Sequence, residues 1–310
     1  MRQAPLIYLI AGEASGDRLG AALMDGLLQL DPDTRFAGIG GPLMAARGLD
    51  SLFAMDELSI MGLVEVLPRL RSLFARRDEV AADIIARQPA ALVTIDSPGF
   101  TLRVAAAARK GSAAPFIHYV APSVWAWKPG RAEKMARSIN HVLALLPFEP
   151  PYMQAAGMSC DFVGHPIAAE PRATAGEIAA LRAQLGIAPD ARILTLLPGS
   201  RGSEVARLAP VFAATAKILA EKHPGLVPLV PAARPSLVPP LQAAFAGTNT
   251  IILPPLADFD AFEAQKRTVF AASSAALAAS GTVSLELAAA NVPMVIGYQM
   301  NALTGWLMRQ

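Results

Sequence analysis

One carboxylate in the sequence stands where a hydrophobic run ends and the chain turns. Asp96 follows the apolar run 91–95 and precedes Ser97-Pro98-Gly99. A carboxylate at the end of a buried strand can accept a proton from a substrate hydroxyl, which makes Asp96 our candidate general base. The competing interpretation is that Asp96 caps a helix that begins near Phe100. A helix start at that position leaves both roles open.

A later segment places an arginine at a glycine-containing turn. Gly199, Ser200 and Arg201 precede a helix that we expect from about Ser203. An arginine there can bind a diphosphate through two parallel hydrogen bonds, and the helix start adds its partial positive charge. The segment therefore predicts a site for an anionic leaving group. The alternative is an Arg201 that is solvated or paired with Glu204.

The segment Ser280-Gly281-Thr282 offers another helix start. A helix that begins near Thr282 places Glu286 about one turn further on, where its carboxylate could accept hydrogen bonds from ribose hydroxyls. The alternative is that Glu286 only makes an alanine-rich helix more soluble.

A glycine-rich turn also follows the first apolar run, 6–10. Backbone amides of the segment from Gly12 to Asp17 could face a phosphate or a sugar, and its polar members are Glu13, Ser15 and Asp17. Gly12 and Gly16 do not match the dinucleotide fingerprint G-x-G-x-x-G, and no Lys-Ser/Thr pair follows. NAD binding and ATP hydrolysis therefore lose support. The alternative is a tight turn that Ser15 or Asp17 caps.

His118 lies at the end of a predicted strand and leads into an aromatic loop with Trp125 and Trp127. The aromatic side chains could stack on a sugar ring or pack between domains. No zinc-ligand spacing surrounds His118 or appears elsewhere in the sequence. We therefore place His118 near the substrate and expect neither a metal nor a cofactor.

The segment 63–77 is basic and amphipathic. Its apolar residues recur at helical spacing among four arginines, which is typical of a helix that lies in an anionic lipid surface. The alternative is a core-facing helix with a solvated basic rim. The residues expected to contact the membrane are Val66, Leu67, Arg69, Leu70, Arg71, Leu73, Phe74, Arg76 and Arg77.

Composition narrows the class of protein that must position these residues. The chain has 310 residues, 53% of them hydrophobic, and a net charge of only +2, which disfavours binding to nucleic acid. Its one cysteine, Cys160, permits no internal disulfide and fits a reducing compartment. The N-terminal run lacks the features of a secretory signal, and polar residues interrupt 271–298 too often for a membrane span.

Short apolar runs alternate with Ala/Leu-rich segments, so we predict an α/β protein with parallel sheets. We expect two doubly wound, Rossmann-like domains, 1–166 and 167–310, that face a central cleft. The Pro/Gly/Ala-rich stretch after Val163 marks their boundary, and the second domain is expected to be incomplete at its C-terminus. Predicted strands are 6–10, 35–39, 91–95, 115–119, 141–145 and 161–163, then 192–197, 226–230, 250–253, 268–271 and 294–298, with helices at 175–184 and 203–222.

Eight motifs in register carry a family resemblance along essentially the whole chain. They are GEASGD, GGPLM, IMGLVEVLP, IDSPGF, HYVAPSVWAW, FVGHP, LLPGSR and SGTVSLE. Together they closely resemble the lipid-A-disaccharide synthase family. The resemblance implies a B-type glycosyltransferase fold and a hexosyltransferase that joins UDP-2,3-diacylglucosamine to 2,3-diacylglucosamine 1-phosphate and releases UDP.

The resemblance also implies roles for the residues above. Asp96 would take the proton of the acceptor 6-hydroxyl, Arg201 and Ser280–Thr282 would neutralise the diphosphate, and Glu286 would hold the ribose. The first domain would bind the acceptor and the second the UDP portion, without a metal. The enzyme would sit peripherally on the cytoplasmic face of the inner membrane, and a homodimer is one option for its assembly. Another UDP-sugar transferase or epimerase, or a non-catalytic nucleotide-sugar or lipid-binding protein, is the alternative.

Overall fold

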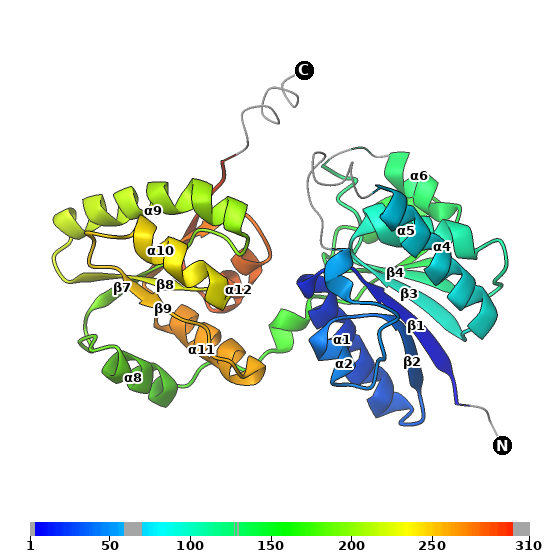
Figure 1. Ribbon diagram of the computed structural model, residues 1–310, viewed down its shortest axis with the longest axis horizontal. Helices are drawn as coiled ribbons and strands as arrows, with labels where there is room; N and C mark the ends of the chain where they lie inside the picture. Colours follow the sequence, from blue (N-terminus) through cyan, green and yellow to red (C-terminus); the bar gives the residue numbers. More distant parts are fainter. Residues whose placement is uncertain (1–3, 59–69, 127, 129, 300–310) are drawn as a thin grey trace. The chain divides into compact units, whose positions relative to one another are not determined.

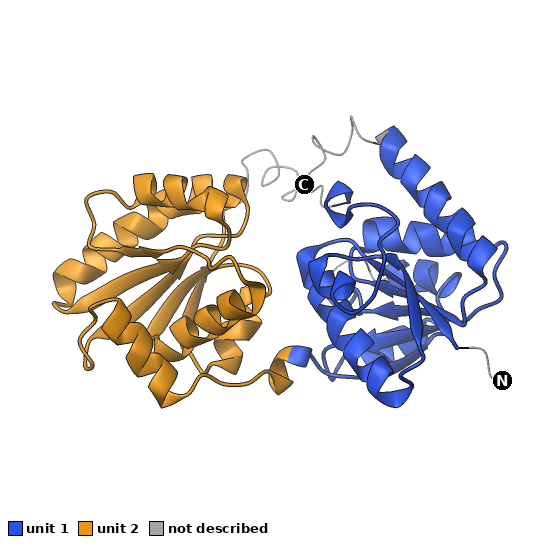
Figure 2. Ribbon diagram, turned by 60° about the horizontal axis from the view of Figure 1, so that its bottom comes forward, with its two compact units in different colours: residues 1–166 blue, residues 167–310 orange. Residues whose placement is uncertain are grey.

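The structure, a computed structural model, describes residues 4–58, 70–126, 128 and 130–299. The chain divides into two compact units, Met1–Pro166 and Ile167–Gln310 (Figure 2). Each unit has one parallel sheet, so the predicted doubly wound α/β class is confirmed. Within the described residues, no helix is both long enough and apolar enough to cross a bilayer.

Unit 1 contains a six-stranded parallel sheet in the order β2-β1-β3-β4-β5-β6. Helix α1 covers one face of this sheet, and α4 and α5 pack together on the other (Figure 1). The strands are β1 (Leu6–Ala11), β2 (Arg35–Ile39), β3 (Ala91–Ile95), β4 (Phe116–Tyr119), β5 (His141–Ala144) and β6 (Ser159–Phe162). The helices are α1 (Ala14–Leu30), α2 (Pro42–Ala45), η1 (Met55–Glu57), α4 (Leu70–Arg87), α5 (Pro98–Ala108), α6 (Gly130–Ala136) and α7 (Pro150–Ala155).

The sheet of unit 1 is buried on both faces, as its near-continuous apolar strands predict. Tyr8, Leu9 and Ile10 of β1 are all fully buried. The Tyr8 hydroxyl keeps a polar partner, because it donates to Asp83 Oδ2 of α4 at 2.9 Å, and Arg87 also binds Asp83. Burial, and then the Asp83 carboxylate, raise the pKa of Tyr8. This contact fixes α4 against β1.

Unit 2 contains a five-stranded parallel sheet in the order β11-β10-β7-β8-β9. Helices α9 and α10 lie on one face and α8 and α11 on the other, and a separate apolar cluster fills each interface (Figure 1). The strands are β7 (Arg192–Leu197), β8 (Leu226–Pro231), β9 (Ile251–Leu253), β10 (Ala275–Ala279) and β11 (Met294–Gly297). The helices are η3 (Pro166–Ala169), α8 (Ala175–Gln184), α9 (Gly202–Lys222), η4 (Pro235–Leu237), α10 (Val238–Ala244), α11 (Phe259–Ala272) and α12 (Val283–Ala289).

One predicted strand, 268–271, is wrong, because this segment forms the last turn of α11. The side chains of Val269 and Phe270, which suggested a strand, are buried in the apolar cluster under that helix. The strand of this region is Ala275–Ala279, whose alanine-rich sequence is typical of a helix. It lies between β7 and β11 and hydrogen-bonds to both, so its conformation depends on its neighbours in the sheet.

The other predicted strands are confirmed, with boundaries that shift by a residue or two. The largest shift is at β6, which runs from Ser159 to Phe162 instead of 161–163. Helix α8 begins and ends where predicted, and its N-terminal Thr174 and Glu177 form a capping box. Segment 271–298, which polar residues interrupt too often for a membrane span, contains the end of α11 followed by β10, α12 and β11.

Each sheet has one point where the strand order reverses. In unit 1 the chain passes from β1 to β2 on one side and then returns to place β3 on the other side of β1. In unit 2 it passes from β7 through β8 and β9 and then returns to place β10 on the other side of β7. The loops at the carboxyl ends of such strand pairs diverge, and ligands of open α/β sheets bind there.

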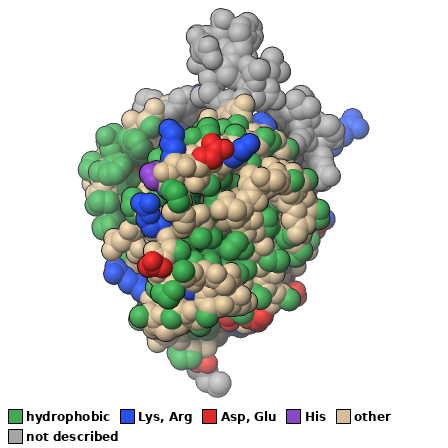
Figure 3. Space-filling model, turned by 90° about the vertical axis from the view of Figure 1, so that its left-hand side faces the viewer, with side chains coloured by type: hydrophobic (Ala, Val, Ile, Leu, Met, Phe, Trp, Pro, Cys, Tyr) green, Lys and Arg blue, Asp and Glu red, His purple; other side chains and the backbone are tan. Residues whose placement is uncertain are grey.

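Charged side chains are sparse on the face of the molecule seen in Figure 3. The Lys and Arg side chains there lie apart from one another among mainly apolar and uncharged groups, and Asp or Glu side chains lie beside some of them. This distribution agrees with the low net charge of +2. A nucleic-acid-binding face would instead gather its cations into a stripe or patch.

Asp17 has a structural role that the sequence analysis did not predict. It is 2% exposed and lies inside α1, whose N-cap is Glu13, so capping of α1 by Ser15 or Asp17 is wrong. Its carboxylate accepts hydrogen bonds from the backbone N–H groups of Gly41, Leu43 and Met44 at 2.8–3.1 Å. Asp17 therefore holds the first turn of α2 against α1 and is not available to an acceptor substrate.

We expect the substitution Asp17→Asn to lower the free energy of unfolding by about 1–3 kcal/mol, because an amide cannot accept all three of these hydrogen bonds and would leave buried N–H groups unpaired. Urea unfolding would measure the loss. Asp25→Asn is the matched control on the same helix, since it weakens only the partly exposed ion pair with Arg47 and should change stability by at most about 1 kcal/mol. Equal losses in the two variants would contradict this role of Asp17.

Candidate active site

The order reversal in unit 1 brings the glycine-rich turn after β1 against the turn after β3. A Cβ added to Gly12 would lie 2.7 Å from Ser97 Oγ, and one added to Gly16 would lie 3.5 Å from the Ile95 carbonyl oxygen. Both glycines are buried. At Gly12 a side chain would collide with Ser97, which is a physical reason for glycine there, whereas at Gly16 a Cβ would make only ordinary van der Waals contact.

Asp96 lies at this reversal in an unusual backbone conformation. Asp96 and Ser97 have φ angles of +48° and +44°, in the left-handed region that non-glycine residues seldom adopt. The Asp96 N–H donates to the Tyr119 carbonyl, and the Thr101 hydroxyl donates to the Asp96 carbonyl at 2.8 Å. The backbone is thus fixed on both sides. The N-cap of α5 is Ser97, so the interpretation of Asp96 as a cap is wrong.

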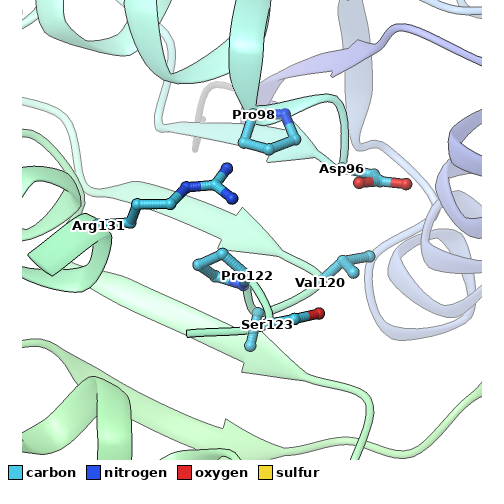
Figure 4. Close-up of a pocket in the computed structure, with 7 residues that line it drawn as sticks. Asp96, Pro98, Val120, Pro122, Ser123 and Arg131 are labelled. Atoms are coloured by element: carbon cyan, nitrogen blue, oxygen red, sulfur yellow. The ribbon is translucent and has the colours of Figure 1, made fainter. Parts of the chain in front are cut away.

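The Asp96 carboxylate lines a pocket of about 290 Å³ that lies entirely within unit 1 (Figure 4). Burial raises the pKa of Asp96, although the Ser97 N–H, which donates to the carboxylate, lowers it in part. A partly desolvated carboxylate of this kind is a stronger base than one in water, which suits proton abstraction. The lining residues are Asp96, Pro98, Val120, Ala121, Pro122, Ser123 and Arg131.

Arg131 is a pocket residue that the sequence analysis missed. It is the second residue of α6 and extends its guanidinium toward the pocket from the side opposite Asp96 (Figure 4). Its sequence environment, WAWKPGR, drew attention to the tryptophans and not to the cation that follows them. A signal was present, because Arg131 lies in the first turn of the helix that follows β4, the strand next to β3.

His118 does not contact the pocket directly and is corrected from a substrate ligand to a residue of the sheet interior. It is fully buried, and its Nδ1 lies 2.8 Å from Thr94 Oγ1 on the neighbouring strand. Burial and then the charge of Arg131 lower the pKa of His118 to about 4. His118 is therefore neutral at physiological pH and adds no charge near Asp96.

The aromatic loop after β4 is held by a buried glutamate that the sequence analysis also missed. Glu149 is 4% exposed and accepts a hydrogen bond from the Leu146 N–H at 2.9 Å and one from the Trp125 side chain. Burial raises the pKa of Glu149. Trp125 also packs edge-to-face on Phe148, with ring centroids 5.3 Å apart. Trp125 is 45% exposed, while Trp127 lies outside the described residues.

In unit 2, the predicted diphosphate turn lies at the carboxyl end of β7. Gly199 has a φ of +124°, and a Cβ there would lie 2.5 Å from the Glu204 side chain. Glu204 accepts hydrogen bonds from the N–H groups of Ser200 and Arg201 at 3.0 and 3.3 Å. Its other oxygen lies 3.3 Å from the Arg201 guanidinium, so the ion pair considered as the alternative is formed. The Arg201 side chain is 45% exposed and accessible to an anion.

The turn Ser280-Gly281-Thr282 follows β10, which pairs directly with β7, so the two predicted donor segments lie on adjacent strands. Helix α12 begins beside Thr282 as predicted. Glu286 is only 15% exposed, and its carboxylate lies 2.8 Å from Lys266 Nζ, which also contacts Glu263. Its interpretation as a merely solubilising residue is therefore wrong. Lys266 fixes the orientation of the Glu286 carboxylate near the turn.

The expected membrane segment is described only from α4 onward. Val66, Leu67 and Arg69, and the side chain of Leu70, lie outside the described residues. Arg71 and Phe74 are exposed, and the Arg77 guanidinium lies over the Phe74 ring. The expectation that Arg76 contacts the membrane is corrected. Its guanidinium binds both oxygens of Glu57, pairs with Glu79 and stacks on Phe53. It anchors α4 to η1 and is not free for lipid.

No group of three or more His, Cys, Asp and Glu side chains with metal-binding proximity occurs among the described residues. Cys160 is buried, and burial raises the pKa of its thiol to about 11. The chemistry that the described groups of unit 1 can perform is therefore proton transfer at Asp96 beside a cationic group, and unit 2 presents an exposed arginine at a turn suited to an anion.

Comparison with known proteins shows the family to which the chain is similar. The family model for lipid-A-disaccharide synthetase matches residues 7–310. The chain is 55% identical over 302 residues to the lipid-A-disaccharide synthase of Ruegeria pomeroyi, which covers 96% of this chain and 75% of that protein. It is 50% identical over 310 residues to the synthase of Rhodospirillum centenum, with 98% and 75% covered.

A solved structure with little sequence similarity shares the fold. The UDP-GlcNAc 2-epimerase of Neisseria meningitidis, solved bound to UDP-GlcNAc, is 11% identical and has a TM-score of 0.65 over 98% of this chain and 84% of that one. At this identity the likeness concerns the fold alone. The family match and the identities of 50% and more are decisive, and the chain belongs to the lipid-A-disaccharide synthase family.

Proposed function

We propose that this chain is a glycosyltransferase of lipid A biosynthesis that transfers 2,3-diacylglucosamine from UDP to 2,3-diacylglucosamine 1-phosphate. Its relatives carry the name of that synthase. The observation that carries the proposal is the partly buried Asp96 carboxylate, which lies at the order reversal of unit 1 and lines a pocket. An epimerase or a non-catalytic binding protein is not favoured by the family match.

In the proposed reaction, deprotonated Asp96 accepts the proton of the acceptor 6-hydroxyl as its oxygen attacks the anomeric carbon of the donor. The bond from that carbon to the diphosphate breaks, and UDP leaves with the electron pair. The product is a β-1,6-linked disaccharide 1-phosphate. The raised pKa of Asp96 favours proton transfer, because the base and the hydroxyl become better matched.

We assign UDP to unit 2 and the acceptor to unit 1. The turns of Gly199–Arg201 and Ser280–Thr282 would hold the diphosphate, and Glu286, oriented by Lys266, would accept hydrogen bonds from the ribose. Positive charge that is fixed before the reaction stabilises the negative charge that develops on the leaving group. The chemistry needs neither a metal nor a cofactor in this proposal.

We also assign the acylated substrates to a membrane surface. Arg71 and Phe74 of α4 are exposed and combine a cation with an aromatic ring, as interfacial helices do. The proposed location is peripheral, on the cytoplasmic face of the inner membrane. A homodimer is an option that this assignment leaves open.

The substitution Asp96→Asn tests the proposed base. Asparagine tolerates the left-handed backbone and keeps the shape of the side chain, so the protein should fold and bind UDP normally. Turnover should fall by about 10²–10⁴-fold, measured as UDP release and as disaccharide by mass. Asp33→Asn, at an exposed position of the same unit, is the control. Retained turnover in Asp96→Asn would remove this residue from the mechanism.

The pH dependence of turnover provides a second test of the same base. Because burial raises the pKa of Asp96, the residue becomes protonated and inactive at a higher pH than an ordinary carboxyl. The rate should therefore decline as the pH falls through this raised pKa, and residual activity in Asp96→Asn should lack that decline. A decline centred at the ordinary aspartate value would contradict the desolvated base.

Arg201→Met tests the donor assignment. Loss of a charge-assisted contact should weaken UDP binding at least about tenfold, as measured by calorimetry, while acceptor binding stays unchanged. Arg207→Met makes the same change at an exposed position further along α9 and is the control. If both variants bind UDP like the parent chain, Arg201 remains only the partner of Glu204.

The double variant Arg71→Glu with Phe74→Ser tests membrane contact. Removing one aromatic ring and reversing one charge should reduce co-sedimentation with anionic vesicles at least about tenfold. The control is Leu30→Ser with Arg35→Glu, which also removes one apolar side chain and reverses one charge. Leu30 is the last residue of α1, Arg35 is the first residue of β2, and both are exposed, so this variant should bind vesicles like the parent chain. If Arg71→Glu with Phe74→Ser binds vesicles like the parent chain, α4 is instead a core-facing helix with a solvated basic rim.

A further inference from the structure

The pocket of unit 1 has a carboxylate on one wall and a guanidinium on the other. Asp96 and Arg131 reach into it from opposite sides, with Pro98 and Pro122 between them (Figure 4). The two side chains form no ion pair with each other, and among the described residues the Arg131 guanidinium has no hydrogen-bond or ion-pair partner. The pocket thus holds a cation whose charge is not compensated by protein groups.

The rest of the lining does not offer that cation an anion. Pro98, Val120, Ala121 and Pro122 are apolar, and Ser123 is uncharged. The imidazole of His118, on the strand that leads to Val120, is fully buried and neutral. An uncompensated cation beside apolar groups attracts anions more strongly than one in open water, because the local dielectric is lower.

Backbone strain is concentrated at the same place. Val120 is β-branched and yet has a φ of +85°, and its N–H donates to the Leu143 carbonyl. Together with Asp96 and Ser97, it belongs to the few described non-glycine residues with positive φ. Conformations of this kind persist where the surrounding structure enforces them, and they cluster at ligand sites. The walls of the pocket are therefore preorganised.

The size of the pocket limits what can lie between the two charges. Its volume of about 290 Å³ is at the lower end of the range for ligand pockets, roughly 300–1,000 Å³. This space suits one sugar ring with a small substituent better than a nucleotide sugar. The ligand must offer a hydroxyl to the carboxylate and an anion to the guanidinium, and arginine is well suited to the planar, two-point recognition of phosphate.

We propose that Arg131 binds the phosphate monoester of the acceptor sugar, so that one ring spans the pocket with its reacting hydroxyl at Asp96 and its phosphate at Arg131. This assignment rests on the proposed function for the identity of the acceptor. It adds a specificity determinant, because a sugar without the phosphate leaves the Arg131 cation unpaired. The site discriminates between phosphorylated and unphosphorylated acceptors through that single contact.

Transferase kinetics on the full chain test the proposal with two acceptors, 2,3-diacylglucosamine with and without its 1-phosphate. Arg131→Met should raise the KM of the phosphorylated acceptor at least tenfold and leave the KM of the UDP donor unchanged. The unphosphorylated acceptor should react equally with the parent chain and with Arg131→Met. Arg131→Lys, which keeps the charge without the planar group, should be intermediate. Arg137→Met, at an exposed arginine just beyond α6, is the matched control and should behave like the parent chain.

Two kinetic results would overturn the proposal. One is an equal loss in Arg131→Met for both acceptors, which indicates a structural role. The other is an increase only in the donor KM, which would place the UDP diphosphate at Arg131. Unchanged UDP binding by calorimetry shows that the variant has folded, so that a loss of acceptor recognition is not mistaken for unfolding.

A binding measurement separates this proposal from the proposed function. Glucosamine 1-phosphate and glucosamine, both without acyl chains, are titrated into the parent chain and into Arg131→Met and followed by NMR. Arg131-dependent binding of the phosphosugar supports the subsite even if no disaccharide is ever formed. Disaccharide formation with an unchanged acceptor KM in Arg131→Met would refute the subsite and leave the function intact. No detectable binding of glucosamine 1-phosphate to the parent chain also counts against it.

Discussion

The close approach of the turns after β1 and β3 is the constraint on which the site of unit 1 depends. Gly12 leaves no room for a Cβ beside Ser97, and this contact sets the position of the chain immediately after Asp96. The left-handed backbone at Asp96 and Ser97 then turns the carboxylate out of the strand. The hydrogen bonds that fix this turn come from the backbone of Tyr119 and the hydroxyl of Thr101, so the base is positioned by its main chain. Its side chain remains available for a substrate.

Unit 2 has the same kind of strand-order reversal, but there the charged groups of the turn are paired with each other. At β7 the Glu204 carboxylate accepts hydrogen bonds from the turn amides and pairs with Arg201, so these donors are satisfied without a ligand. An incoming diphosphate would exchange one anionic partner for another, which avoids the penalty of leaving cations and N–H groups unpaired. In the described part of unit 1, neither the Asp96 carboxylate nor the Arg131 guanidinium has an ion-pair partner, and burial raises the pKa of Asp96. In unit 2 the charges of the turn are thus paired before a ligand binds, whereas in unit 1 the charges of the pocket are not paired with each other.

The sequence predicts those features that local pattern determines. Apolar runs bounded by turn residues identify ten of the eleven strands, and the Gly-Ser-Arg and Ser-Gly-Thr turns fall at strand ends as expected. Strand β10 was missed because Ala275–Ala279 is a strand only through its pairing with β7 and β11. Asp17 and Arg131 were misassigned or missed for a related reason. The amides that Asp17 binds lie 24 or more residues away, and Arg131 reaches the pocket from α6, which follows β4, whereas Asp96 follows β3.

The separation of charges in the pocket has a consequence for catalysis. Burial is the main cause of the raised pKa of Asp96, and Arg131, on the opposite side of the pocket, forms no ion pair with it. A phosphate bound without a cation would raise the pKa of Asp96 further, because a second negative charge disfavours the carboxylate. When the phosphate binds at Arg131, the positive guanidinium neutralises much of the added negative charge. Arg131 would therefore keep Asp96 able to act as a base while the charged acceptor is bound, a task that an arginine adjacent to Asp96 could not perform without also weakening the base.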